Sequence, residues 1–260
     1  MKTFNVLSID YDYFVKCSAD YRVWNFPDGG NENLPSTVID CIWQSRYATT
    51  PDLDTIDILE DEFDIVSELV INLSKKGVPV YYFDSHKYAF DIITNAALQE
   101  IKLTNLKITN IDFHSDVYDF GVAGDTEPVD CGNWFRKIVE LFNLYGGNFI
   151  NKDYLWIARD DSDKSPWVDS KVRYGNLVHA SDNHPISQYL DEYYDLIYIC
   201  RSGAWTPPHL DNYLGYLLRS LKHYSGEEFQ DRYTKNFLSG VEQIRKSIPQ
   251  VFKDFPDTSK

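Results

Sequence analysis

The sequence predicts a three-layer α/β/α fold around a mostly parallel sheet. Short apolar runs end in turn signals, these runs alternate with segments of helical periodicity, and 43% of the 260 residues are hydrophobic. Alternating strands and helices are typical of α/β folds, and continuous apolar runs are typical of strands buried on both faces. We therefore expect a single domain over residues 1–260.

Five apolar runs predict the strands of this sheet. They span residues 4–9, 78–83, 106–113, 154–158 and 196–200. Each run is bounded by polar or charged residues, which indicate where the chain leaves the sheet.

Helical periodicity predicts the layers that cover the sheet. In residues 59–73 apolar side chains recur every three or four positions, and Gly77 provides a C-terminal stop. Further helices are predicted over residues 88–101, 134–145, 207–221 and 227–248. The helix over residues 207–221 opens at Pro207-Pro208, where proline suits a first helical turn.

The segment 17–57 interrupts this alternation. It is rich in Gly, Pro, Asn and aromatic residues, and it separates the first strand from the next helix. A segment of this length is typical of a functional loop, so we predict an insertion or lid. Its aromatic residues could cover a cleft, grip a peptide or form a small core of their own. They are Tyr21, Trp24, Phe26, Trp43 and Tyr47.

Charge excludes several kinds of partner. The chain has 25 Lys and Arg against 40 Asp and Glu, a formal net charge of −15. This balance argues against nucleic acid and against an anionic membrane, and it permits a cationic substrate. We find no apolar run that predicts a membrane span and no signal-peptide pattern. The four cysteines are scattered without a CxxC pair, which favours reduced thiols and a cytoplasmic protein.

Acidic residues and histidines collect where predicted strands end. Asp10 and Asp12 follow the first strand, His86 follows the second, and the Asp112-x-His114-x-Asp116 pattern closes the third. Ligands of open α/β sheets bind beyond the carboxyl ends of the strands. In an extended segment residues i, i+2 and i+4 point to one side, so these side chains are expected to converge.

Such a set of carboxylates and imidazoles predicts a metal site. The four aspartates carry a charge of −4, which two divalent ions would balance, and a bridging hydroxide would then serve as nucleophile. Mixed oxygen and imidazole ligands suit Mn²⁺, Fe²⁺ or Zn²⁺ better than Ca²⁺.

At these positions the sequence resembles the ureohydrolase (arginase/agmatinase) and deacetylase superfamily. Residues 111–116 (Ile-Asp-Phe-His-Ser-Asp) resemble its DAHxD motif, and 8–12 (Ser-Ile-Asp-Tyr-Asp) resemble its SxDxD motif. Residues 83–86 are similar to the GGDH strand end, and 131–133 to an SGN turn. Residues 199–208 resemble a branch that includes peptide arginases, which convert arginine side chains of precursor peptides to ornithine. The SxDxD motif comes first here, so the arginase-like order looks circularly permuted.

This resemblance implies a site with two Mn²⁺ ions. Asp10 and Asp112 would bridge them, His86 and Asp116 would complete one, and Asp12 and His114 the other. The expected reaction releases urea from arginine in a precursor peptide, and His114 and Asp116 are the predicted catalytic residues, with Asp116 or metal-bound water protonating the leaving amine.

The substrate would be held by further residues. Asn133 matches the asparagine of the SGN turn, and Asp130 is a candidate for binding the guanidinium. Other candidate anions, and histidines that could replace the family's loop histidine, are Asp160, Asp182, His179 and His184.

Other functions fit parts of the pattern. A small-molecule guanidino hydrolase would use the same site. A deacetylase would use one Zn²⁺ and a His-His pair, which the sequence lacks. A phosphatase of the haloacid dehalogenase type would use Asp10 as nucleophile but leaves residues 112–116 unexplained. A non-catalytic binding module is the fourth alternative.

Overall fold

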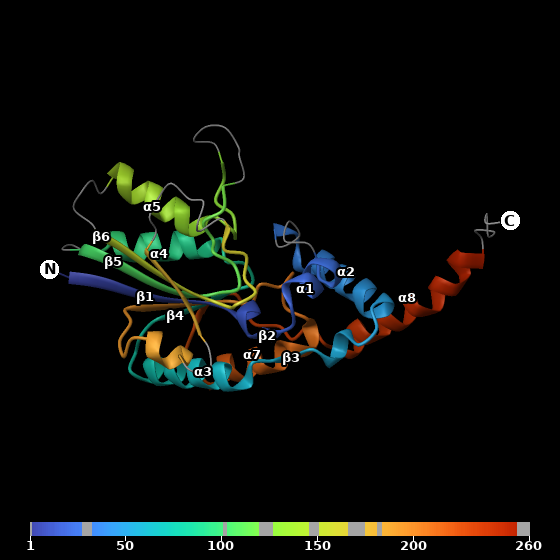
Figure 1. The fold of residues 1–260 in the computed structure, drawn as a ribbon. Helices are drawn as coiled ribbons and strands as arrows, with labels where there is room; N and C mark the ends of the chain where they lie inside the picture. The colour runs from blue at the N-terminus through green and yellow to red at the C-terminus, as the bar shows by residue number, and fades with distance from the viewer. Residues whose placement is uncertain are drawn as a thin grey trace.

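The computed structural model describes residues 2–27, 33–100, 103–119, 127–145, 151–165, 175–180 and 184–253. It confirms the α/β fold with a seven-stranded sheet of order β7-β6-β5-β1-β8-β4-β9, in which every neighbouring pair is parallel (Figure 1). The strands are β1 Lys2–Asp10, β4 Val80–Phe83, β5 Leu103–Ile111, β6 Asn151–Ala158, β7 Gly175–His179, β8 Leu196–Cys200 and β9 Ser225–Gly226. Two further strands, β2 Val15–Lys16 and β3 Asp57–Ile58, form a separate antiparallel pair.

Helices cover both faces of the sheet. α4 (Tyr88–Leu98) and α5 (Trp134–Tyr145) lie on one face, and α3 (Glu60–Lys75) and α7 (Asp211–Ser220) lie on the other (Figure 1). Each layer has its own apolar cluster, because strand side chains alternate between the two faces. The three layers predicted from the sequence are therefore present.

The register of the central strands places the site. β1 lies between β5 and β8, with Ile9 opposite Ile111 and Asp10 opposite Cys200. Phe83 at the end of β4 also lies opposite Cys200. The carboxyl ends of four neighbouring strands therefore meet at one edge, as the sequence argument requires.

Some boundaries differ from the predictions. The strand predicted over 106–113 ends at Ile111, and the helix predicted over 227–248 begins only at Lys235 as α8 (Lys235–Lys253). The residues before α8 are not helical, and two contacts hold them to the sheet and to α7: Glu227 N donates to Tyr82 O, and Arg232 binds Asp211. The first turn predicted after Pro207 is a short 3-10 helix, Pro208–Leu210, ahead of α7.

Strands β7 and β9 were not predicted. β9 has only two residues, and β7 contains Gly175, Asn176 and His179 in place of a continuous apolar run. Both pair with a strand that is already part of the sheet, so pairing rather than local sequence determines them.

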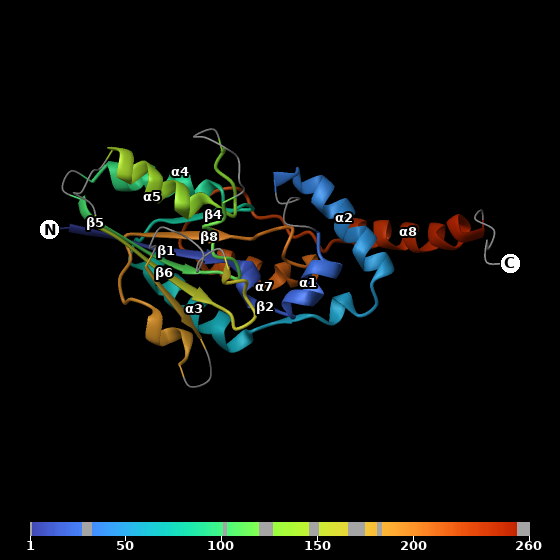
Figure 2. The same cartoon turned by 45° about the horizontal axis from the view of Figure 1, so that its top comes forward.

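Much of the segment 17–57 is helical. α1 (Ala19–Asn25) and α2 (Ser36–Thr49) replace the expected loop, and α2 lies side by side with α8 in both views (Figures 1 and 2). Phe26, Trp43 and Tyr47 are buried, and Tyr47 packs edge-on against Phe237 of α8. Three of the predicted aromatic residues therefore form a core, whereas Trp24 is 76% exposed.

The described helices do not include a membrane-spanning candidate. None of them combines the length and the apolar character that crossing a bilayer would need.

Replacing Trp43 tests how strongly the segment is attached. Trp43 is fully buried, and its indole N–H donates to Gly203 O at 2.8 Å. We expect Trp43→Ala to lower the free energy of unfolding by about 3–5 kcal/mol, because it leaves a cavity and removes one of the two hydrogen bonds that Gly203 O accepts. Urea denaturation measures this, with Trp24→Ala as the matched control, expected within about 0.5 kcal/mol of wild type. Equal losses of unfolding free energy in Trp43→Ala and Trp24→Ala would contradict the burial of Trp43 in the core of this segment.

Candidate metal centre

The six predicted ligands come together at the carboxyl edge of the sheet. Asp10 is the last residue of β1, and Asp12 lies in the 3-10 helix Tyr11–Phe14 that follows. His86 follows β4, and Asp112, His114 and Asp116 follow β5. His114 is 22% exposed, and the other five are at least 97% buried. The site is therefore a closed cluster with one accessible imidazole.

Three carboxylates face the Nδ1 atom of His86. Its distances to an Oδ2 atom are 3.3 Å for Asp10, 3.2 Å for Asp112 and 3.0 Å for Asp116. Nε2 of the same ring lies 2.7 Å from Ser8 Oγ, which fixes the orientation of the imidazole. Atoms bound about 2.1 Å from one ion lie roughly 3 Å apart, so this spacing suits a divalent cation.

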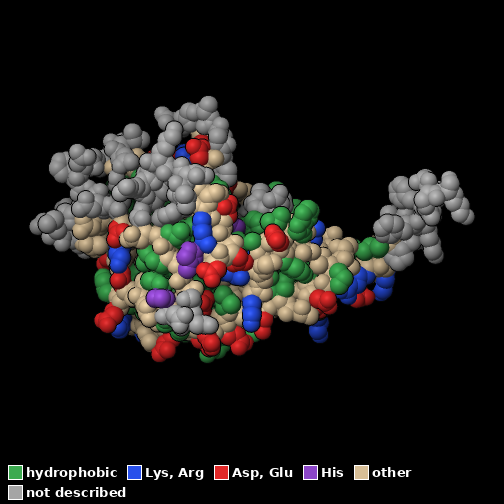
Figure 3. Space-filling view, in the orientation of Figure 1, with side chains coloured by type: hydrophobic (Ala, Val, Ile, Leu, Met, Phe, Trp, Pro, Cys, Tyr) green, Lys and Arg blue, Asp and Glu red, His purple; other side chains and the backbone are tan. Residues whose placement is uncertain are grey.

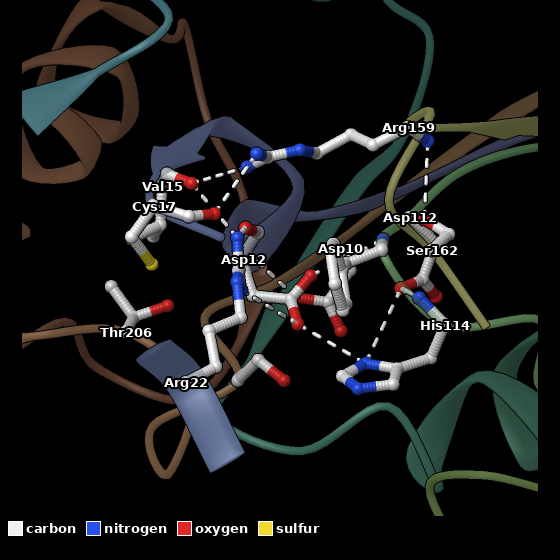
Figure 4. A network of polar contacts seen from close by, with 12 residues as sticks. Asp10, Asp12, Val15, Cys17, Arg22, Asp112, His114, Arg159, Ser162 and Thr206 are labelled. Carbon is white, nitrogen blue, oxygen red and sulfur yellow. Dashed lines mark hydrogen bonds and ion pairs between the residues drawn. The ribbon is translucent and has the colours of Figure 1, made fainter. Parts of the chain in front are cut away.

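A second set of ligand atoms lies beside the first. His114 Nδ1 is 3.1 Å from Asp12 Oδ2 and 3.9 Å from Asp112 Oδ1 (Figure 4). Asp112 belongs to both sets, one oxygen facing each, as a bridging ligand would. Asp10 groups with His86 and with Cys200, so its own bridging role remains a prediction.

The ligands converge through turns rather than through an extended strand. Asp10 Oδ1 accepts from Asp12 N at 3.0 Å, and Asp112 Oδ1 accepts from His114 N at 2.7 Å. Asp116 has φ +54°, a left-handed conformation that few residues other than glycine adopt. The extended geometry expected for residues 112–116 is therefore wrong, although the predicted convergence is confirmed. Such backbone strain is typical of functional sites.

Buried neighbours hold the carboxylates in place. Asn110 Nδ2 donates to Asp112 Oδ2 at 3.0 Å, and Trp156 donates to Asp112 O at 3.0 Å. Trp134 at the start of α5 donates its indole N–H to Asp116 Oδ2. Sequence patterns do not mark these residues, because their function depends on which strands become neighbours. Only Ser8 carried a signal, as part of the SxDxD-like run.

The strand end that carries His86 is fixed by ion pairs. Asp84 pairs with Arg201, whose Nη1 lies 3.1 Å from Asp211, and Arg232 binds the same Asp211 through Nε at 2.9 Å. Burial raises the pKa of Asp84, but the charge of Arg201 outweighs it, so the pKa is lowered overall. This network joins β4, β8, α7 and the residues before α8.

Electrostatics show that the cluster requires positive charge. Burial, and then the charge of Asp12, raises the pKa of Asp10 to about 7. Burial, and then the charge of Asp116, raises the pKa of Asp112 to about 8. Burial opposes a charge on His114, but Asp12 outweighs it and raises the pKa of His114 to about 9. Protons therefore balance the carboxylates where no cation does, and a divalent ion would replace them.

The predicted substrate residues lie in a neighbouring turn. Asn133 is fully buried: its Oδ1 accepts from Asp130 N at 2.7 Å, and its Nδ2 donates to Pro128 O at 3.0 Å. Asp130 accepts from Gly132 N and from Asn33 at the start of the α2 region. The amide of Asn133 is thus used within its own turn, and a substrate contact for either residue remains a prediction.

The other candidates are more distant in the fold. His179 ends β7, at the sheet edge, and its Nδ1 lies 3.8 Å from Asp160 Oδ1. His184 is exposed, and Asp182 lies outside the described residues. The described contacts do not bring His179, Asp160 or His184 to the six-ligand cluster.

Comparison of the chain with protein-family models, with curated proteins and with solved structures gives no match. Function therefore has to be inferred from the geometry of the site.

Metal stabilisation is expected to increase with pH. Between pH 4 and 8 the folded metal-free protein retains protons on Asp10 and Asp112 that the unfolded chain has lost, so its stability falls as pH rises. Mn²⁺ must displace these protons, so the rise in Tm on adding Mn²⁺ should be larger at pH 8.5 than at pH 6. Thermal unfolding with EDTA or Mn²⁺ measures it. Asp160→Asn, which changes an exposed acid outside the cluster, is the control and should show the same rise in Tm as wild type. A rise in Tm that does not depend on pH would contradict a metal site at Asp10 and Asp112.

Proposed function

We propose that this protein is a hydrolase with two Mn²⁺ ions that converts arginine side chains of a peptide to ornithine and releases urea. The observation that carries the proposal is the position of Asp112, which faces both His86 and His114 with different oxygens. Together with the resemblance of residues 8–12 and 111–116 to ureohydrolase motifs, this arrangement favours a binuclear centre. The preference for Mn²⁺ rests on the mixed donors and on that resemblance.

The chain's own residues would divide the work. Asp10, His86, Asp112 and Asp116 would hold one ion, and Asp12, His114 and the shared Asp112 the other. Bound there, two divalent ions would lower the pKa of a water molecule and so supply a nucleophile at neutral pH. Asp116 would pass a proton to the leaving amine, and Trp134 fixes its Oδ2 for that purpose.

The accessible side of the centre suits a guanidinium. His114 is the most exposed ligand, and the ring of Trp205 lies 4.9 Å from its ring, centroid to centroid. Trp205 is half-buried, so part of this residue reaches solvent. A flat indole attracts a flat cation, which makes Trp205 a candidate surface for the arginine side chain.

Surface features favour a basic peptide as substrate. Two large apolar side chains of α1 are exposed, Val23 at 68% and Trp24 at 76%. Both follow Arg22 directly in the chain, and Arg22 faces Asp12. Figure 3 shows hydrophobic side chains over α1 and α2, and acidic side chains along the edge formed by α3. The first turn of α3 carries Glu60, Asp61 and Glu62. An apolar patch next to negative charge suits a peptide better than free arginine.

Two alternatives find less support in the geometry. A deacetylase would use one Zn²⁺ held by an Asp-His-Asp set, which leaves one of the two groups of ligand atoms unused. A phosphatase nucleophile needs a free carboxylate, whereas Asp10 faces His86 and accepts from Asp12 N.

No disulfide joins the four cysteines, all of which the structure describes, so a reducing cytoplasm fits the proposal.

Asp112→Asn tests the proposed reaction. We expect wild type loaded with Mn²⁺ to release urea from an arginine-containing peptide, and the variant to lose at least about 10³-fold in kcat because it removes the charge of the shared ligand. A colorimetric urea assay and mass spectrometry of the peptide, which loses the mass of cyanamide, measure the outcome. Asp64→Asn, which changes an exposed acid of α3, is the matched control. Loaded wild type that releases no urea from peptide, arginine or agmatine would overturn the proposal.

Trp205→Ala tests the guanidinium surface. We expect KM for the peptide to rise roughly 2- to 30-fold, as the loss of a cation–π contact predicts, while the metal content stays unchanged. Steady-state kinetics and metal analysis give both values. Trp205→Phe, which keeps an aromatic face, should retain most of the affinity. An unchanged KM in Trp205→Ala would remove Trp205 from the substrate site.

A further inference from the structure

A buried guanidinium lies against one of the proposed metal ligands. Arg22 of α1 is 1% exposed, and its Nη1 lies 3.7 Å from Asp12 Oδ2 (Figure 4). Its Nη2 donates to Asp12 O and to Val15 O, both at 2.8 Å. Its Cζ lies 4.1 Å from the ring centroid of Phe113. In the sequence Phe113 stands between the proposed ligands Asp112 and His114. Arg22 is thus held from three sides in one position.

This guanidinium affects only one of the two sets of ligands. A buried arginine is costly unless an anion faces it, and the carboxylate that faces Arg22 is Asp12. Among the described ion pairs, Asp10, Asp112 and Asp116 face histidine but no lysine or arginine. No lysine or arginine in these ion pairs therefore offsets the charge of the first set, whereas Arg22 partly neutralises the second.

We propose that Arg22 makes the two metal positions unequal. The position formed by Asp10, His86, Asp112 and Asp116 holds its ion firmly. The position formed by Asp12, His114 and the shared Asp112 binds its ion more weakly and exchanges it. The four aspartates and Arg22 carry −4 + 1 = −3, so a first divalent ion meets a net negative site and a second one leaves a net charge of +1. This inference rests on the proposed binuclear centre, not on the substrate.

Arg159 provides a matched control for Arg22. It also donates to Val15 O, and its Cζ lies 5.5 Å from the ring centroid of Phe113. Its carboxylate partner, however, is Asp161 at 3.1 Å rather than a proposed metal ligand. A change at Arg159 therefore loosens the same backbone without changing the charge beside Asp12.

Metal titration of three variants tests the proposal. Metal-free protein is titrated with Mn²⁺ by calorimetry, and free and bound Mn²⁺ are followed by electron paramagnetic resonance. We expect wild type to bind two ions with dissociation constants at least about tenfold apart, and Arg22→Gln to tighten the weaker one by about tenfold or more. Arg22→Lys keeps the charge and should keep the difference. Arg159→Gln should leave the weaker constant unchanged.

The outcomes separate this inference from the proposed function. Two equal affinities in wild type would overturn it, whether or not any variant folds. A weaker constant that does not tighten in Arg22→Gln, or that tightens equally in Arg159→Gln, would also overturn it. Unequal binding in a protein that hydrolyses no guanidinium would sustain the inference and refute the hydrolase. Urea release by a protein that binds its two Mn²⁺ ions with equal affinity would support the proposed hydrolase and refute this inference.

Discussion

Four buried carboxylates at one edge of the sheet are the constraint on which the rest of the site depends. Asp10, Asp12, Asp112 and Asp116 are each at least 97% buried, so their charges need partners. Two imidazoles and one arginine face them in the structure. Burial raises the pKa of Asp10 to about 7 and that of Asp112 to about 8, so these carboxyls favour a bound proton where no cation is present. A divalent cation meets the same need more completely, which is why the cluster suits metal.

The fold brings these charges together through strand alignment and tight turns. Parallel pairing of β1 with β5 and β8 aligns the strand ends, and two tight turns direct the side chains inward. The segment 17–57 then closes the site from one side. Its helix α1 supplies Arg22, which faces Asp12. Trp43 of α2 donates a hydrogen bond to Gly203 O, just beyond the end of β8. The segment is therefore part of the centre's structure as well as of its surroundings.

The sequence predicted the features that local pattern determines. Apolar runs and helical periodicity were enough for the layers, and strand ends were enough for six ligands that the structure brings together. Arg22 could not be predicted, because arginine is rarely buried and nothing local marks it as facing Asp12. Asn110, Trp134 and Trp156 were missed for a related reason, since their roles depend on strand order and helix docking. The extended geometry assumed for residues 112–116 failed because Asp112 forms a turn with His114 N.

We propose that Asp112 is shared by two divalent ions. Anomalous X-ray scattering from crystals soaked in Mn²⁺ tests it most directly, because it locates each ion independently of activity. We predict two peaks on opposite sides of the Asp112 carboxylate, one beside His86 and one beside His114, with the peak at His114 weaker at limiting Mn²⁺. No peak in the cluster, or one ion at His86 even in saturating Mn²⁺, would contradict the account.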